Sequence, residues 1–273
     1  TKEFRFMRSP SLKQKLKSGA RLNGCWIETF NPIAAEIMAM SGYDTAMIDL
    51  EHGAGSVLDA VSMMQALESR DCPPMIRATS ADCNTIKRIL DIGPMGIMVP
   101  NVRNTQEAKE VVSACRYGPE GIRGAAPILL RATNYGKDIA HYQQWMENDF
   151  LLIAQIESKE AVDQIDDIAA IDGIDMLFIG PIDLSASLGQ LGQFKSKGFI
   201  EAFEKIERAA LAAGKFLGAI PFADWSAERL YENGHHLVLS GADSILLREA
   251  AEQDVADLNN ALIEADRKKP ALS

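Results

Sequence analysis

Four short segments of this sequence place ionisable or amide side chains directly after, or at the end of, an apolar run. These side chains are Asp49, Glu51 and His52 after the first run, Arg77 in the second, Gln155 and Glu157 after the third, and Asp183 after the fourth. One charged residue in such a place is commonly solvated or paired with a neighbour. Four such places in one chain favour an active site, because strand ends are the usual source of catalytic side chains in α/β barrels.

Glu157 and Asp183 are the candidate metal ligands. They follow strands that are expected to be neighbours, and two carboxylates that face one point repel each other unless a proton or a cation lies between them. A site built from oxygen ligands, without a nearby cysteine or paired histidine, suits Mg²⁺, Mn²⁺ or Co²⁺ better than structural zinc. The alternative is a pair of capping or loop carboxylates that point to solvent.

The segment GPID offers a second device for an acidic ligand. Gly180 and Pro181 open a turn that can point the backbone amides of Ile182 and Asp183 at one anion, for example a substrate carboxylate.

Arg77 lies in an apolar strand, where an unpaired guanidinium is costly, so it must face a buried carboxylate or a ligand oxygen. We expect Asp49 and His52 to form a dyad in which the carboxylate fixes the tautomer of the imidazole and raises its basicity. Glu51 can point into the barrel mouth or pair with a nearby lysine or arginine, and its role stays open.

Eight short β-rich apolar segments, most of them followed by stretches of helical apolar spacing, must position these groups. The segments are LNGCWIET, TAMIDLEH, PMIRAT, GIMVPNV, LLIAQIES, MLFIGPID, FLGAIPF and LVLSGADSILL. Strands that are joined by helices are expected to be parallel, and about eight such units in a chain of this length predict a (β/α)8 barrel. A doubly wound open sheet is disfavoured because no G-x-G-x-x-G follows the first strand and no Walker A sequence occurs.

The chain is predicted to form one α/β domain over residues 1–273, with a short N-terminal arm and a C-terminal helix. The widest gap between strand segments covers residues 115–150. This gap is too long for a simple loop, so we expect it to border the active site.

Composition excludes several classes of protein. A formal net charge of −10 disfavours nucleic acid or an anionic membrane surface as the partner. No apolar run is long enough to cross a bilayer, and the N-terminal residues lack the apolar core of a signal peptide. The four cysteines show no paired spacing, as expected for reduced thiols, so the expected compartment is the cytoplasm.

The motifs IDLEH, IRAT, VPNV, RYGPEGIRG, QIES and FIGPIDLS occur in this order between about Leu22 and about Glu249. Taken together they resemble the HpcH/HpaI aldolase family, the metal-dependent pyruvate aldolases that include 4-hydroxy-2-oxoheptanedioate aldolase and 2-dehydro-3-deoxyglucarate aldolase. The resemblance implies a (β/α)8 TIM barrel of the phosphoenolpyruvate/pyruvate-binding type. It also implies a homo-oligomer, either a trimer or a hexamer of paired trimers.

The resemblance assigns a role to each candidate residue. It implies that Glu157 and Asp183 bind the divalent ion and that Arg77 contacts the keto oxygen of pyruvate. It implies that His52, with Asp49, transfers protons.

The remaining implied roles concern the pyruvate end of the site. The backbone amides of Ile182 and Asp183 would receive the pyruvate carboxylate. Gln155 would support the metal site, and Arg123 would lie close to it. The segment GAAPILLRATNYG and the longer N-terminal arm depart from the usual family pattern, which bears on the choice of aldehyde.

The expected activity is the reversible, divalent-metal-dependent cleavage of a 4-hydroxy-2-oxo acid into pyruvate and an aldehyde through a metal-bound enolate. The first alternative is oxaloacetate decarboxylation with enolate chemistry like that of macrophomate synthase. The second is a catalytically idle barrel that binds a sugar acid. Cleavage of coenzyme A thioesters, as in citrate lyase β-subunits, is disfavoured because no basic cluster suits the phosphates of the coenzyme.

Overall fold

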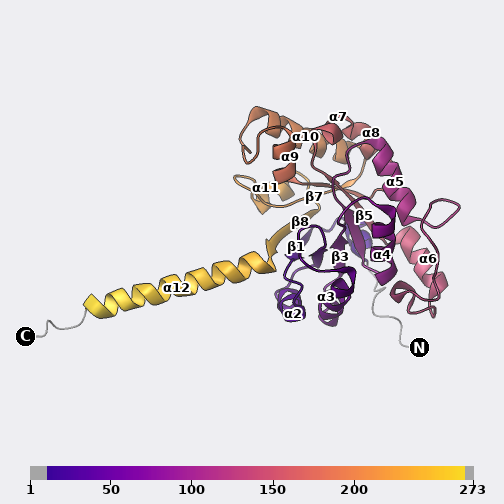
Figure 1. The fold of residues 1–273 in the computed structure, drawn as a ribbon. Coiled ribbons are helices and arrows are strands. Elements are labelled where there is room, and N and C mark those ends of the chain that lie inside the picture. The colour runs from indigo at the N-terminus through magenta and orange to yellow at the C-terminus, as the bar shows by residue number, and fades with distance from the viewer. Residues whose placement is uncertain (1–10, 268–273) are drawn as a thin grey trace, which may run out of the picture.

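The computed structural model describes residues 11–267, and within them a closed barrel of eight parallel strands surrounds a packed interior (Figure 1). Each strand pairs with the next along the chain, and β8 pairs with β1. The strands are β1 (Leu22–Ile27), β2 (Thr45–Asp49), β3 (Pro74–Arg77), β4 (Gly96–Val99), β5 (Leu151–Ile156), β6 (Met176–Ile179), β7 (Phe216–Ala219) and β8 (Leu237–Ala242). The expectation of a (β/α)8 TIM barrel is confirmed, and every one of the eight predicted segments contains a strand.

Helices connect the strands and cover the outside of the barrel. The helices are α1 (Leu12–Lys17), α2 (Pro32–Met40), α3 (Val57–Ser69), α4 (Cys83–Ile92), α5 (Thr105–Cys115), the 3-10 turn η1 (Arg131–Thr133), α6 (Ile139–Asn148), α7 (Lys159–Asp163), α8 (Ile165–Ala169), α9 (Pro181–Ser187), α10 (Lys197–Ala212), α11 (Ala227–Glu232) and α12 (Asp243–Arg267). Several begin at a capping side chain, such as Ser56 before α3 and Asp82 before α4, which accepts a hydrogen bond from a free amide of the first turn.

Alternation along the strands creates two apolar cores. One set of side chains packs inside the barrel, and Leu12 and Leu16 of α1 join this inner core, so α1 closes the end at which the strands begin. The other set packs between the strands and the surrounding helices. Side chains alternate between the two faces of a strand, so a residue two positions after an inward-facing apolar residue also points inward. It lies nearer the carboxyl end of the strand, which is the barrel mouth, at the opposite end from α1.

The register brings Asp49 and Arg77 together. They are direct partners on β2 and β3, and each follows an inward-facing methionine by two positions, Met47 and Met75 respectively. Both side chains therefore point into the barrel near its carboxyl end.

The long segment of residues 115–150 lies at the opposite end from the one that was expected. It connects the end of α5 to the start of β5 and contains η1 and α6. Since the helices run antiparallel to the strands, a connection from a helix to the next strand lies where the strands begin. The expectation that this segment borders the active site of its own barrel is therefore wrong, and GAAPILLRATNYG (residues 124–136) lies away from the mouth with it.

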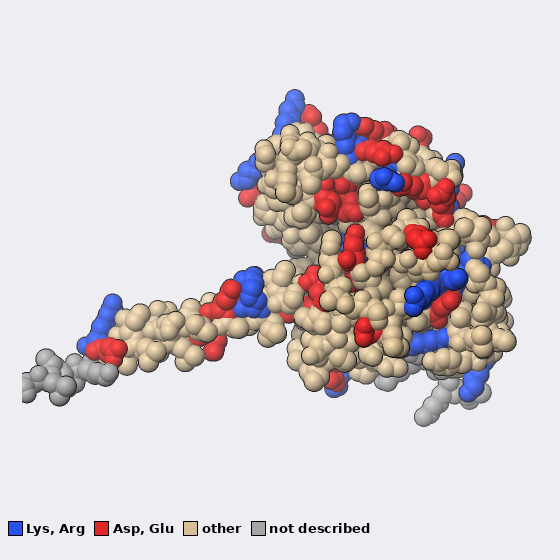
Figure 2. All heavy atoms as spheres, in the orientation of Figure 1, with Lys and Arg blue, Asp and Glu red and all other residues tan. Residues whose placement is uncertain are grey.

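The C-terminal helix extends away from the barrel. Helix α12 contacts β1, β8 and α2 near its start, and every residue from Ile245 to Arg267 is exposed. Figure 2 shows it as a rod that stands apart from the body, with uncharged stretches between its charged groups.

In residues 11–267 none of the helices combines the length and the apolar character that crossing a bilayer requires. The predicted N-terminal arm falls largely on residues 1–10, which lie outside the described residues.

Candidate active site

A cavity of about 470 Å³ opens at the carboxyl ends of the strands. Five residues predicted from the sequence line it: His52, Arg77, Gln155, Ile182 and Asp183. Asp49 and Glu157 lie directly behind this lining, where Asp49 is fully buried and Glu157 is 6% exposed. The barrel thus gathers the ends of β2, β3, β5 and β6 around one space, as in other α/β barrels whose strand ends carry the chemistry.

Asp49 and Glu51 together hold the guanidinium of Arg77 in one orientation. Arg77 donates from Nε to Oδ1 of Asp49 over 2.9 Å and from Nη2 to Oδ2 over 2.6 Å, which is a bidentate pair. Its third nitrogen, Nη1, lies 3.2 Å from Oε2 of Glu51. The guanidinium carbon lies 4.5 Å from the ring centroid of Trp26, so the cation also rests on an aromatic face.

The charges of this group shift the pKa values of its acids. Burial raises the pKa of Asp49, but the hydrogen bonds and the charge of Arg77, together with the hydrogen bonds from the amides of Glu51 and His52, outweigh burial, and the pKa is lowered. Burial raises the pKa of Glu51, and the charge of Arg77 only partly opposes this shift. Of the two alternatives that the sequence left open, the pair with a buried carboxylate is present, and Arg77 also lines the cavity.

The expected contact between the Asp49 carboxylate and the His52 imidazole is absent. Asp49 accepts hydrogen bonds from the backbone amides of Glu51 and His52 and two more from the guanidinium of Arg77. The imidazole of His52 is 64% exposed, and its Nε2 lies 3.9 Å from Oε2 of Glu51. Since the chain turns directly after β2, Asp49 caps that turn, and Glu51 is the acid beside the imidazole.

Glu157 is held by two donors in a site of high negative potential. Its Oε1 accepts a hydrogen bond from the amide of Asn101 over 2.8 Å, and its Oε2 accepts one from Nε2 of Gln155. Burial, followed by the nearby charges of Asp183 and Glu51, raises the pKa of Glu157 to about 7. Among the described residues, the Oε1 of Gln155 is buried without a hydrogen-bond partner.

The turn from β6 into α9 lies against this carboxylate. A Cβ on Gly180 would lie 2.3 Å from Oε2 of Glu157 and 2.9 Å from Nε2 of Gln155, so only glycine allows the close approach. Helix α9 begins after Gly180 with Pro181, and no side chain caps its first turn. The amides of Ile182 and Asp183 therefore belong to the uncapped start of a helix beside the cavity.

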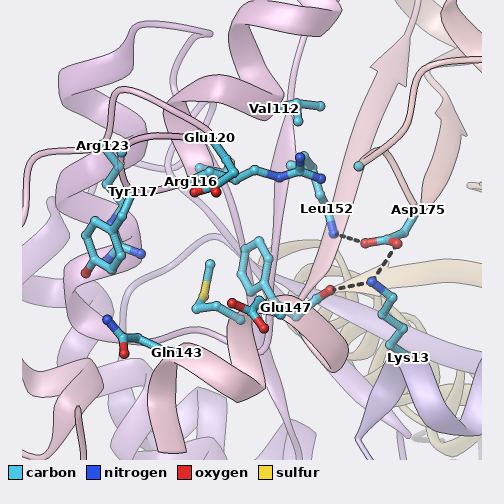
Figure 3. A pocket seen from close by; sticks show the side chains of 15 residues that line it. Lys13, Val112, Arg116, Tyr117, Glu120, Arg123, Gln143, Glu147, Leu152 and Asp175 are labelled. Atoms are coloured by element: carbon cyan, nitrogen blue, oxygen red, sulfur yellow. Dashed lines mark hydrogen bonds and ion pairs between the residues drawn. The ribbon is translucent and has the colours of Figure 1, made fainter. Parts of the chain in front are cut away.

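Arg123 lies elsewhere, so the expectation that it is close to the metal site is wrong for this chain. It donates to Asp91 at the end of α4 and to the hydroxyl of Tyr142 on α6, each over 2.9 Å. Figure 3 shows it beside Tyr117 in a separate cavity of about 610 Å³, where Lys13 is linked to Asp175. The physical reason is that Arg123 follows α5, whose end lies where the strands begin.

Among the lining residues that sequence reasoning missed are Trp26 and Glu28. Both are on or directly after β1, in the inward-facing alternation that starts with Leu22. The segment LNGCWIET carried this signal, because it also ends an apolar run with an acid.

Comparisons with known proteins identify the family. The model of the HpcH/HpaI aldolase/citrate lyase family matches residues 22–250. The chain belongs to this family. The expected resemblance is thus confirmed, and both activities in the family's description break carbon–carbon bonds.

Individual relatives of this HpcH/HpaI chain cover nearly its whole length. It is 37% identical over 239 residues to a hydroxypyruvate/pyruvate aldolase of Delftia acidovorans, covering 88% of each chain. It is 36% identical over 248 residues to 2-keto-3-deoxy-L-rhamnonate aldolase of Escherichia coli K12, covering 91% of this chain and 92% of the relative. A solved HpcH/HpaI family structure from Burkholderia cenocepacia is similar with a TM-score of 0.85 at 31% identity, covering 91% of this chain and 98% of the other.

Proposed function

We propose that this protein is a divalent-metal-dependent pyruvate aldolase that cleaves a 4-hydroxy-2-oxo acid into pyruvate and an aldehyde, and also catalyses the reverse addition. The observation that carries the proposal is the cavity at the barrel mouth, where a fixed guanidinium, an exposed imidazole and a carboxylate pair stand around one space. The aldolase names of its relatives support it.

The residues at the carboxylate pair fit a divalent cation. The charge of Asp183 contributes to the raised pKa of Glu157, which is the repulsion that a cation would remove. The donor atoms are carboxylate oxygens, with the unpartnered Oε1 of Gln155 beside them, and this set suits Mg²⁺, Mn²⁺ or Co²⁺. Among the described residues no group of three or more His, Cys, Asp or Glu side chains is placed to hold a metal, so Glu157 and Asp183 would share the ion with water and substrate.

A divalent ion held by Glu157 and Asp183 would supply Lewis-acid stabilisation of the negative charge on the keto oxygen. Arg77 would donate a hydrogen bond to the same oxygen, because Asp49 and Trp26 fix its guanidinium at the cavity wall. The free amides at the start of α9 would bind the pyruvate carboxylate.

His52 would transfer the proton of the reaction. In cleavage its imidazole accepts the proton of the C4 hydroxyl, directly or through water, while the C3–C4 bond breaks and its electron pair passes to the pyruvate enolate. The aldehyde leaves, and the enolate accepts a proton at C3, from the His52 imidazolium or from water, to give pyruvate. With Nε2 3.9 Å from Glu51, the imidazolium would be stabilised by that carboxylate rather than by Asp49.

We propose a homo-oligomer as the working form, and helix α12 supports this. Its exposed residues Leu247, Val255, Leu258 and Leu262 recur at helical spacing and form one apolar stripe. Helix α2, which lies next to the start of α12, carries a second exposed apolar stripe. A second copy of the chain carries the same two apolar stripes, so the stripes of two copies can cover each other in a symmetric interface.

The cytoplasm remains the proposed compartment. All four cysteines are free, and Cys25, Cys72 and Cys115 are buried without forming a disulfide, which agrees with a reducing environment.

The proposal is tested by following pyruvate release from several 4-hydroxy-2-oxo acids and, separately, from oxaloacetate. Chelator-treated protein should be inactive and should recover with Mg²⁺, Mn²⁺ or Co²⁺. Glu157→Gln should abolish both the recovery and the rise in melting temperature that bound Mn²⁺ produces in the unaltered protein. Pyruvate from oxaloacetate alone would favour the decarboxylase alternative, full activity in chelator would exclude the metal, and no pyruvate from any acid would favour the idle barrel.

A further inference from the structure

The cavity wall contains an acid, Glu28, that has no role in the proposed mechanism. Glu28 follows β1 and lines the cavity, whereas Glu157 follows β5. In a closed ring of eight strands β1 and β5 are opposite each other, so Glu28 faces the metal and pyruvate end across the barrel mouth. The part of a substrate that extends furthest from pyruvate therefore meets the wall that contains Glu28.

The carboxylate of Glu28 is held in place by the start of α12. The amide of Glu28 donates to Oδ1 of the buried Asp243 over 2.9 Å, and the hydroxyl of Ser244 donates to Oε2 of Glu28 over 2.7 Å. Within residues 11–267 the other oxygen, Oε1, has no hydrogen-bond partner. The half-buried side chain of Glu28, with one oxygen anchored, therefore has a fixed position at the cavity wall.

The surrounding wall offers no cation to balance a second anionic group. Next to Glu28 the lining is largely apolar, with Trp26, Ile220, Pro221 and Leu239. Arg77 is the one lysine or arginine among the described lining residues. Its charge is paired with Asp49 and Glu51, and the proposed mechanism directs its remaining donor to the keto oxygen at the pyruvate end. A second carboxylate on the substrate would therefore meet Glu28 in an apolar surrounding, where like charges repel strongly.

We propose that Glu28 selects uncharged aldehydes and excludes aldehydes that carry a carboxylate. This inference rests on the proposed aldolase function and names the substrate class of its acceptor end. Selection of this kind works by repulsion of the wrong partner rather than by extra contacts to the right one.

The experiment measures kcat/KM for aldol addition of pyruvate to two aldehydes of similar size, pentanal and succinic semialdehyde. The unaltered protein should favour pentanal by about tenfold or more. Glu28→Gln keeps an oxygen that accepts the Ser244 hydrogen bond but removes the charge, so it should reduce this preference by about fivefold or more, mainly by improving the reaction of succinic semialdehyde. Glu36→Gln, the same change at a partly exposed acid on α2 that is paired with Arg70 outside the cavity, should leave the preference unaltered.

Two further measurements keep the inference separate from the proposed function. Exchange of the C3 protons of pyruvate in D₂O reports the pyruvate end without any aldehyde and should proceed in both variants. High ionic strength should weaken the preference of the unaltered protein, because the repulsion is electrostatic, and this holds as a test even if Glu28→Gln folds poorly.

If the unaltered protein exchanges the C3 protons of pyruvate and its kcat/KM for succinic semialdehyde equals or exceeds that for pentanal, the role of Glu28 is overturned and the aldolase proposal stays intact. A preference that is unchanged in Glu28→Gln would overturn it as well. Absence of both exchange and aldol product with every ion would overturn the proposed function and the inference that rests on it.

Discussion

Arg77 combines a structural and a chemical position. Its bidentate pair with the fully buried Asp49 resembles a core ion pair, whose separation leaves an uncompensated buried charge. Its place in the cavity wall above Trp26 is that of an anion-binding group.

We predict that Arg77→Lys lowers kcat on the order of a hundredfold, the typical cost of losing one preorganised donor. Lysine keeps the charge but cannot form the two parallel bonds to Asp49, so the melting temperature should also fall. The C3 proton exchange of pyruvate, measured on the folded fraction, should fall in parallel with kcat. Normal turnover by that folded fraction would show that Arg77 is only an ion-pair residue.

At the scale of elements, the turn between β6 and α9 is shaped by the side chains it must pass. Gly180 has a φ of −91°, which any residue adopts, so its importance comes from space and not from backbone strain. The close approach fixes Glu157 and Gln155 between β5 and the start of α9.

We predict that Gly180→Ala folds but weakens Mn²⁺ binding by at least about tenfold, because displaced supporting groups typically cost 10- to 100-fold in metal affinity. The new Cβ would displace Oε2 of Glu157 or Nε2 of Gln155. Titration calorimetry with Mn²⁺ measures the affinity. Gly198→Ala in α10 is the control, because its new Cβ would come no closer than 3.4 Å to the side chain of Gln190, which is an ordinary contact. Unchanged Mn²⁺ affinity in Gly180→Ala would show that Glu157 is not a ligand held by this turn.

The long segment after α5 is attached to α3 by an ion pair. Arg131 of η1 lies 2.9 Å from Oε2 of Glu68, while Oε1 of Glu68 is buried without a hydrogen-bond partner. Burial raises the pKa of Glu68 from its ordinary 4.5 to about 7, and the charge of Arg131 only partly opposes the shift. The ionised form of Glu68 is therefore less favourable in the folded protein than in the unfolded chain.

The sign of the resulting pH dependence follows from proton binding. Below pH 4.5 Glu68 is protonated in both states, and between about pH 4.5 and 7 only the folded state keeps the proton, so stability falls as the pH rises through this window. Glutamine cannot ionise, so the variant lacks this loss of stability. We predict that the change in the free energy of unfolding caused by Glu68→Gln is more favourable at pH 8 than at pH 4.5 by roughly 1–3 kcal/mol. Urea unfolding at both pH values and one protein concentration measures this, and an equal effect at the two pH values would contradict it.

At the scale of the whole molecule, helix α12 has no partner within its own chain for most of its length. Its 25 residues would extend roughly 37 Å at 1.5 Å per residue, and from Ile245 onward all of them are exposed. An isolated helix gains little stability from propensity alone, so its apolar stripe indicates a surface that another copy covers.

We predict that light scattering will give the unaltered protein a mass of at least two copies. Leu258→Glu, in the apolar stripe of α12, should lower that mass or make it strongly dependent on concentration, because a buried charge opposes association. Asn260→Glu, on another face of the same helix, should leave the mass unchanged. A monomeric unaltered protein would remove the support that α12 gives to the homo-oligomer.

The sequence by itself determined the barrel, because the eight apolar strand segments and the helical spacing between them are patterns of neighbouring residues that can be read along the chain. It also determined which strand ends carry polar groups, whereas the register that pairs Asp49 with Arg77 belongs to the assembled sheet. The direction of side chains after a strand ends is not local. Asp49 turned to Arg77 and the following amides instead of to His52 because the neighbouring strand supplies a charged partner there.

Only the tertiary structure decided at which end of the barrel each connection lies. Arg123 and the rest of the segment after α5 reach the end where the strands begin, because a helix that returns antiparallel to its strand must end there. The same closure of the ring set Glu28 opposite Glu157, two residues that are more than a hundred positions apart in the sequence. Distances between strand ends arise when β8 closes on β1, and no pattern within a single segment contains them.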